Sequence, residues 1–224
     1  MDNLFSANLS ANAPLAERMR PKTLAEVIGQ DHLQEPLRTI LHAQGMLSFV
    51  LWGPPGTGKT TLARIFAAEK QARFEPLSAV SDGVKRIREI VEESKLRIAE
   101  GGEPVVLFLD EIHRFTKSQQ DSLLDDVERG RLTLIGATTE NPMFTVNSAL
   151  FRRSTVFRLE PLAPADVEAV VRRAIADPDR GFGRLDLTVD DDAVAHWARV
   201  SDGDARRALN ALEVAVLSAQ AQDA

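Results

Sequence analysis

The feature that most constrains this chain is the octapeptide GPPGTGKT, residues 53–60, which lies directly after the apolar run LSFVLW and before a helical pattern. A strand, a glycine-rich loop and a helix in this order are the context of a P-loop. Backbone N–H groups of such a loop turn towards phosphate oxygens, and the positive end of the following helix faces them. The lysine reaches the β- and γ-phosphates, and the next hydroxyl takes a magnesium position. We therefore expect ATP and Mg²⁺ to bind through Pro54, Pro55, Gly56, Thr57, Gly58, Lys59, Thr60 and Thr61, with Thr60 on the metal.

Short apolar runs alternate with longer amphipathic stretches as far as Pro161. The run VVLFL is apolar on both faces, as a strand covered by helices on both sides of a parallel sheet requires. The pattern predicts a doubly wound α/β core. Beyond Pro161 helices are expected over residues 164–176, 190–200 and 204–219. We predict a flexible N-terminus over residues 1–13, the α/β core over 14–161 and a small helical lid domain over 162–220.

A second chemical signal is VVLFLDEIHRF, in which an apolar strand ends in two adjacent carboxylates. Asp110 at the strand end is a candidate magnesium ligand, and Glu111 is a candidate to polarise a water beside the γ-phosphate. Such a pair can also be an ordinary solvated strand end, but its company with a P-loop favours the catalytic interpretation. A glutamate next to the magnesium aspartate suits transfer to water, so the pattern indicates ATP hydrolysis.

Composition excludes several other classes of protein. The absence of cysteine excludes disulfides and thiolate metal sites, and the four histidines show no paired spacing typical of zinc ligands. With 27 basic and 33 acidic side chains the chain has a formal charge of -6, so any contact with DNA has to use a local basic face. No apolar run approaches the roughly 20 residues of a membrane span, which predicts a cytoplasmic protein.

Several stretches together resemble AAA+ clamp-loader-like ATPases, and more narrowly the replication-associated recombination protein A family with its Werner-helicase-interacting relatives. They are ERMRPKTLAEVIGQ, LWGPPGTGKTTLA, SAVSDGVKRIRE, DEIHRFTKSQQD, GATTENPMFTVNSAL and GDARRALNALE. The similarity runs from about Pro14 to about Val216. It implies an AAA+ ATPase that acts on DNA at stalled forks, gaps or ends, together with single-strand-binding protein. Family members generally continue into a tetramer-forming domain, so we expect a fragment of a homo-oligomeric protein.

The resemblance also assigns individual residues. It puts Arg20, Pro21, Ile28 and Gly29 around the adenine and Arg206 at the sensor 2 position of the lid. Thr138 matches sensor 1, where clamp loaders more often have asparagine, and Asn141 is the alternative. The arginine finger matches Arg153, but relatives have Ser-Arg where this chain has Arg152-Arg153, so the position is ambiguous by one residue.

Basic residues that could meet DNA follow the second and third strands. They are Lys85, Arg86, Arg88, Arg114 and Lys117. A solvated charged face is the alternative for all of them. For the whole chain, the rival to an ATPase is a nucleotide-gated binding module without turnover, which the complete catalytic set disfavours. A branch-migrating motor shares the core but would need a DNA-binding winged helix after the lid.

Overall fold

The computed structural model describes residues 13–222, which form two compact units. The larger unit contains residues 22–24 and 31–159. The smaller contains the described residues up to Pro21, Ala25–Gln30 and the residues from Glu160 onward. The segment predicted to be flexible, residues 1–13, lies outside the described residues apart from Ala13. Within residues 13–222, no helix is long and apolar enough to cross a membrane.

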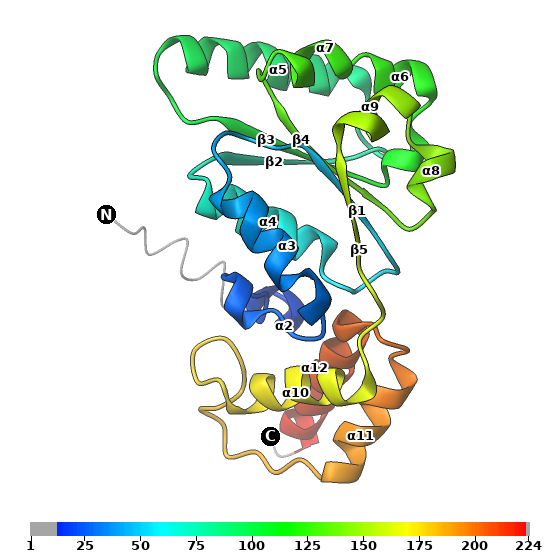
Figure 1. The fold of residues 1–224 in the computed structure, drawn as a ribbon. Helices are drawn as coiled ribbons and strands as arrows, with labels where there is room; N and C mark the ends of the chain where they lie inside the picture. Colours follow the sequence, from blue (N-terminus) through cyan, green and yellow to red (C-terminus); the bar gives the residue numbers. More distant parts are fainter. Residues whose placement is uncertain (1–12, 223–224) are drawn as a thin grey trace. The chain divides into compact units, whose positions relative to one another are not determined.

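A five-stranded parallel sheet forms the centre of the larger unit (Figure 1). Its strands are β1 (Phe49–Trp52), β2 (Arg73–Ser78), β3 (Val105–Asp110), β4 (Thr133–Thr138) and β5 (Thr155–Arg158), in the spatial order β2-β3-β4-β1-β5. All four neighbouring pairs are parallel. The strands β1, β3 and β4 coincide with apolar runs, whereas the edge strand β2 is mixed in sequence and only partly buried. The predicted doubly wound sheet is confirmed.

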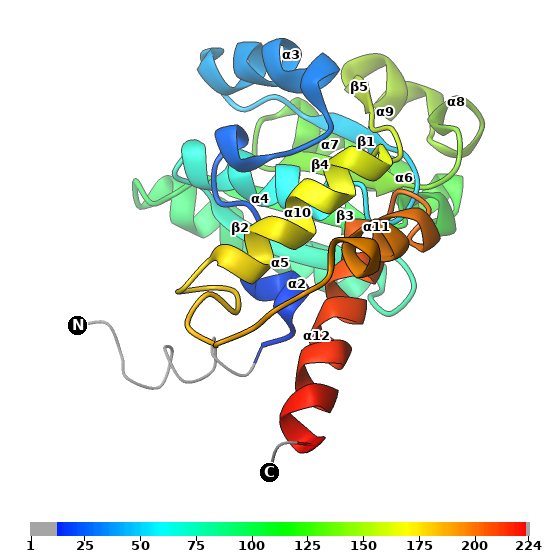
Figure 2. The ribbon, with the colours of Figure 1, turned by 90° about the horizontal axis from the view of Figure 1, so that it is seen from below.

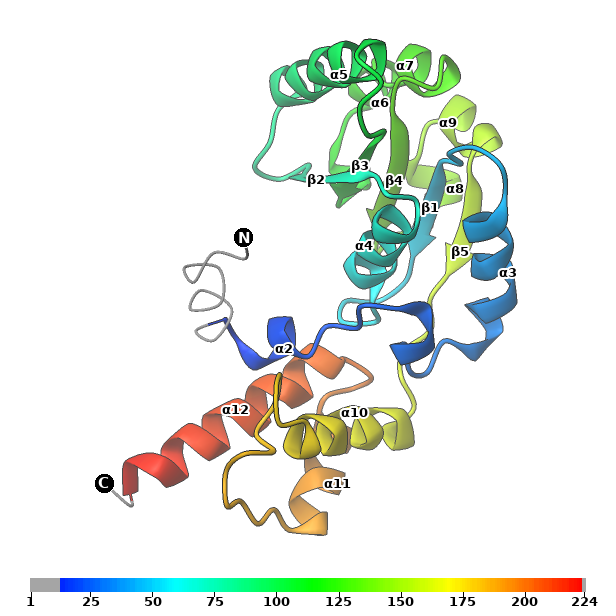
Figure 3. The same ribbon diagram turned by 90° about the vertical axis from the view of Figure 1, so that its left-hand side faces the viewer.

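Helices cover both faces of this sheet (Figures 1 and 3). On one face α5 (Val84–Ala99) packs with Ile87 and Ile90 against Leu107 and Leu109 of β3. On the opposite face lies α4 (Lys59–Glu69), whose Phe66 makes an edge-to-face contact with Phe49 of β1 at 5.0 Å between ring centroids. The three central strands β3, β4 and β1 are therefore apolar on both sides because both sides are covered.

The remaining helices of the larger unit are mostly short. They are α3 (Asp31–His42), the 3₁₀ turn η2 (Ile112–Arg114), α6 (Lys117–Asp121), α7 (Leu124–Glu128), α8 (Pro142–Thr145) and α9 (Ser148–Arg153). A further 3₁₀ turn, η1, spans Leu24–Glu26. Buried Gln120 of α6 donates to the carbonyls of Phe115 and Thr145 at 3.1 and 3.0 Å, and thereby ties the segment after β3 to α8.

The smaller unit is helical, as the sequence predicts for its C-terminal part. It contains α2 (Leu15–Arg18), α10 (Pro164–Ala176), α11 (Asp191–Val200) and α12 (Ala205–Gln222). One apolar core joins all four helices and includes Leu15, Val167, Val194 and Leu212. Figures 2 and 3 show α2 beside α12, and the Leu15 N–H donates to a carboxylate oxygen of Glu213 at 2.8 Å. The predicted boundary between residues 161 and 162 remains a prediction, while α2 shares the core of these later helices.

Candidate nucleotide site

Strand order brings the P-loop, the carboxylate pair and Thr138 to one edge of the sheet, at the carboxyl ends of the strands. The P-loop follows β1, the carboxylate pair ends β3, and β4 lies between these two strands. Because parallel strands end at the same edge, Thr138 at the end of β4 lies between the two motifs. Its register partner is Trp52, and its carbonyl accepts from the N–H of Gly53 at 3.1 Å.

The P-loop has the backbone that a phosphate cradle needs. Gly56 and Gly58 have φ values of 72° and 103°, which glycine adopts without steric cost. The α4 helix begins at Lys59, and the Leu62 N–H bonds the carbonyl of Gly58 at 2.9 Å. N–H groups of the first turn have no acceptor within their own helix, so they are available to an anion. A side chain at Gly58 would meet open space, so glycine is required there by conformation.

The Lys59 ammonium is largely buried and lies against its own loop. Its Nζ donates to the carbonyls of Gly53 and Pro54, each at 2.7 Å, and the side chain is part of a residue only 8% exposed. Thr57 closes the same loop by donating its hydroxyl to the Pro54 carbonyl at 2.9 Å. Phosphate oxygens bind an ammonium more strongly than neutral carbonyls do. The ammonium can therefore exchange these carbonyls for the phosphates of a nucleoside triphosphate.

The carboxylate pair differs in backbone conformation. Asp110 ends β3, whereas Glu111 has φ 55° and ψ 41° in the left-handed region. For a residue other than glycine this conformation costs on the order of 1–3 kcal/mol, and such strain gathers at functional sites. The Glu111 N–H donates to Oδ1 of Asp110 at 3.1 Å. Among residues 13–222 no cluster of three or more acidic or histidine side chains could hold a metal. Thr60 and Asp110 nevertheless fit Mg²⁺, which commonly takes few protein ligands beside phosphates.

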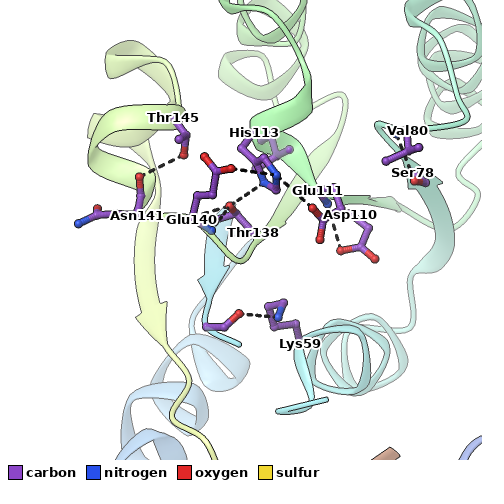
Figure 4. A network of polar contacts seen from close by, with 12 residues as sticks. Lys59, Ser78, Val80, Asp110, Glu111, His113, Thr138, Glu140, Asn141 and Thr145 are labelled. Atoms are coloured by element: carbon purple, nitrogen blue, oxygen red, sulfur yellow. Dashed lines mark hydrogen bonds and ion pairs between the residues drawn. The ribbon is translucent and has the colours of Figure 1, made fainter. Parts of the chain in front are cut away.

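His113 is the site residue that the sequence did not reveal. Figure 4 shows its ring between the ends of β3 and β4. Nε2 lies 3.1 Å from Oε2 of Glu111 and 3.6 Å from Oε1 of Glu140, while Nδ1 lies 3.0 Å from the Thr138 hydroxyl. Spacing alone gave only four scattered histidines, and the one local signal for His113 was its place two residues after Glu111 in DEIHRF.

The two candidates for sensor 1 have different surroundings. Thr138 is fully buried and contacts His113, whereas the Asn141 side chain caps α8 by accepting from the Met143 N–H at 3.0 Å. A capping oxygen is already used in the local turn. The geometry thus favours Thr138, and its role as a sensor stays a prediction.

The two arginines before β5 lie at the amino ends of the strands, whereas the P-loop lies at the carboxyl ends. Thr155 at the start of β5 is paired with Phe49 at the start of β1. Arg153 forms an ion pair with Glu128 of α7 at 2.8 Å and donates to the Ala149 carbonyl at 3.2 Å. Arg152 is exposed and has no polar partner within the described part of the chain. Which of the two is an arginine finger remains open.

The candidates of the smaller unit form a separate set. They are Arg20, Pro21, Ile28, Gly29 and Arg206. Arg20 forms an ion pair with Glu17. Gly29 has φ 76°, which favours glycine, and a Cβ there would lie 2.5 Å from Cδ2 of Leu162, so a larger residue would displace that side chain. Arg206 is exposed in the first turn of α12, where its N–H bonds the Asp204 carboxylate at 2.9 Å. That these five residues contact a bound nucleotide stays a prediction.

The candidate basic residues for DNA divide into two kinds. Arg86 is engaged with Glu89 at 3.2 Å and Glu93 at 3.8 Å, and its hydrogen bond to Glu89 raises the pKa of its guanidinium. Lys85 and Arg88 on the same helix are exposed and have no ion-pair partner among residues 13–222. The same holds for Arg114 and Lys117, which follow β3.

Comparison with known proteins agrees with this geometry. The model of the ATPase family associated with various cellular activities matches residues 49–162, and a model of the AAA C-terminal domain matches residues 183–224. The chain belongs to the AAA family of ATPases. It is 47% identical to replication-associated recombination protein A of Escherichia coli K12, over 100% of the chain and 51% of that protein. The resemblance to the replication-associated recombination protein A family is therefore confirmed.

Two further relatives extend the comparison. An uncharacterized AAA domain-containing protein of Mycobacterium tuberculosis is 52% identical over 95% of the chain and 47% of its own length. The chain thus spans about half the length of these curated relatives. Among solved structures, the Thermotoga maritima RuvB Holliday junction branch migration motor has a TM-score of 0.70 and 30% identity, over 86% of this chain and 63% of that one. The AAA+ core and its helical C-terminal part are thus shared with this motor.

Proposed function

We propose that this AAA ATPase hydrolyses ATP at the carboxyl edge of its sheet and couples the reaction to an action on DNA. The observation that carries the proposal is the order β3-β4-β1, which gathers Asp110, Glu111, Thr138 and the P-loop at one edge. Carboxyl ends of parallel strands are the usual ligand edge of open α/β sheets. No other edge of the sheet combines a phosphate cradle with adjacent carboxylates among residues 13–222.

The site residues of the larger unit divide the reaction between them in this proposal. Lys59 and the N–H groups of the P-loop hold the β- and γ-phosphates, while Thr60 and Asp110 hold Mg²⁺. When bound, the ion neutralises charge that develops on the phosphate oxygens. Glu111 orients the attacking water and accepts its proton, and the Thr138 hydroxyl orients the same water or the γ-phosphate.

In this proposal, residues of the smaller unit and of a neighbouring subunit complete the site. Arg206 would approach the γ-phosphate from the lid, Arg20, Pro21, Ile28 and Gly29 would surround the adenine, and an arginine from a neighbouring subunit would stabilise charge on the transferring phosphate. The similarity to replication-associated recombination protein A supports a homo-oligomer that works on DNA ends, gaps or stalled forks beside single-strand-binding protein. It also supports a place in the cytoplasm near the nucleoid.

The test is ATP turnover with and without single-stranded, duplex and forked DNA, combined with two variants. Lys59→Ala removes the phosphate clamp and should abolish nucleotide binding. Glu111→Gln keeps the shape of the side chain, so ATP should still bind while turnover falls about 10²- to 10⁴-fold, as expected for loss of a general base. Turnover at the parental rate in Glu111→Gln would contradict the proposed reaction. Turnover that no DNA alters would contradict the coupling to DNA, whereas ATP binding without turnover would leave a nucleotide-gated binding module.

A further inference from the structure

His113 is a buried polar side chain to which the mechanism above gives no task. Its side chain is 5% exposed and lies in η2, two residues after Glu111. Its two ring nitrogens contact residues from two different strand ends, Glu111 after β3 and Thr138 on β4. Figure 4 shows the ring between these two side chains, with Glu140 on the third side. Both ring nitrogens therefore contact residues of the proposed site, which a side chain that only packs in the core would not do.

The surrounding donors determine which way the contacts run. The Glu140 N–H donates to the Thr138 hydroxyl oxygen at 3.0 Å, which leaves the hydroxyl proton for Nδ1 of His113 at 3.0 Å. Nε2 then carries the ring proton and donates it to Glu111 at 3.1 Å. The hydroxyl also lies 3.2 Å from the Glu140 carbonyl, which is a second acceptor for its proton. With the ring proton on Nε2, Glu111 accepts a hydrogen bond from His113.

Glu111 has a particular need of such a partner. Its left-handed backbone, with φ 55°, is a conformation that only surrounding contacts maintain in a residue with a side chain. The same carboxylate is 30% exposed, so solvent and alternative rotamers compete for it. A hydrogen bond from a nearly buried ring selects one orientation of the carboxylate over these alternatives.

We propose that His113 is a positioning residue that couples Glu111 to Thr138, so that both act on one water beside the γ-phosphate. The inference rests on the proposed role of Glu111 as general base. The ring holds the two groups at a fixed separation across the gap between β3 and β4, and loss of the ring frees them separately. A misplacement of about 1 Å at a reacting group costs about 10²-fold in rate.

The experiment compares three replacements of His113 by kcat, by KM for ATP and by nucleotide binding. His113→Leu removes both contacts and should lower kcat by about 10- to 100-fold while KM and ATP binding stay near parental values. His113→Gln can still donate to Glu111 from the Nε2 position and should recover most of kcat. His113→Asn can reach only Thr138 and should resemble the leucine variant.

A matched control separates positioning from packing. Gln120→Leu replaces a fully buried polar side chain of the same segment, which contacts neither Glu111 nor Thr138. It should lower the melting temperature but retain kcat when assayed well below that temperature. Combining His113→Leu with Thr138→Val should cost clearly less than the product of the two single effects, because both remove one network.

The possible outcomes have distinct meanings. If Glu111→Gln is inactive but His113→Leu keeps the parental kcat, or if Gln120→Leu reproduces the loss, the positioning role is wrong. If Glu111→Gln hydrolyses ATP normally, the proposed function itself fails. Multiplicative effects of His113→Leu and Thr138→Val would overturn the coupling.

Discussion

Arg153 gives the sharpest test of whether the active site is shared between subunits. The residue precedes β5 at the edge of the sheet opposite the P-loop, and β5 spans roughly 10 Å at the usual rise of a strand. Within its own unit its guanidinium pairs with Glu128 instead of facing the phosphate cradle. If Arg153 serves as a finger, it has to serve a neighbour's ATP.

Two magnitudes distinguish a finger from a surface charge. Arg153 and Glu128 are 48% and 44% exposed, and such ion pairs contribute about 0.2–1 kcal/mol to stability. A trans-acting arginine in other P-loop enzymes is worth about 10³ to 10⁵ in turnover, equivalent to roughly 4 to 7 kcal/mol of barrier. Arg153→Ala should therefore barely change the melting temperature and yet nearly abolish turnover. Glu128→Gln releases the guanidinium at a cost of at most about 1 kcal/mol, so it should leave turnover equal or up to about fivefold higher.

The assay is specific ATP turnover as a function of protein concentration. Activity should rise with concentration, because the arginine's contribution is lost when subunits separate. Arg153→Ala subunits mixed with Lys59→Ala subunits should regain activity, since each supplies what the other lacks. Arg152→Ala is the matched control, and a larger loss there would move the finger by one residue. Turnover that is independent of concentration, with no rescue in the mixture, would refute a shared site.

The other predictions concern DNA and acid stability. Reversing Lys85 and Arg88 together should weaken DNA binding and flatten its salt dependence by about 0.9 in log-log slope for each lost duplex phosphate contact. An unchanged slope would assign both to the solvated surface. Hydrogen bonds from the N–H groups of Arg180 and Asp179 lower the pKa of Asp177. Their stabilisation is present above the unfolded pKa of about 3.9 and lost as pH falls through the folded value. Asp177→Asn should cost about 1–3 kcal/mol at pH 7 and progressively less as pH falls through that folded value, as measured by urea unfolding across a pH series.

Strands and long helices could be predicted because their signals are local. VVLFL and LTLIGA are apolar runs bounded by polar residues, and α10 begins and ends at the residues expected, Pro164 and Ala176. By contrast, α8 and α9 have four and six residues, too few for a helical period to emerge. The packing of α2 on α12 was equally hidden, since the contact between Leu15 and Glu213 spans 198 positions in the chain.

The candidate site was predictable motif by motif but not as an arrangement. Residue type and spacing in GPPGTGKT and in the carboxylate pair indicate phosphate binding and hydrolysis. Which strands are neighbours is a property of the folded sheet, and this decides that Thr138 lies between them. His113 could not be found before that order was known, because its partners come from positions 111 and 138.

The proposed sensor role of Thr138 can be argued from the same arrangement. Asparagine offers both a donor and an acceptor on a longer side chain, whereas threonine offers one hydroxyl close to the backbone. Here that hydroxyl already receives the Glu140 N–H and contacts His113, while the Thr138 carbonyl receives the Gly53 N–H. Thr138 is thus bonded to the P-loop on one side and, through His113, to Glu111 on the other. A short side chain suffices at this point because the ring of His113 spans the remaining distance to the carboxylate. Thr138→Asn would have to displace that ring, so it should lower turnover even though asparagine is the commoner residue in clamp loaders.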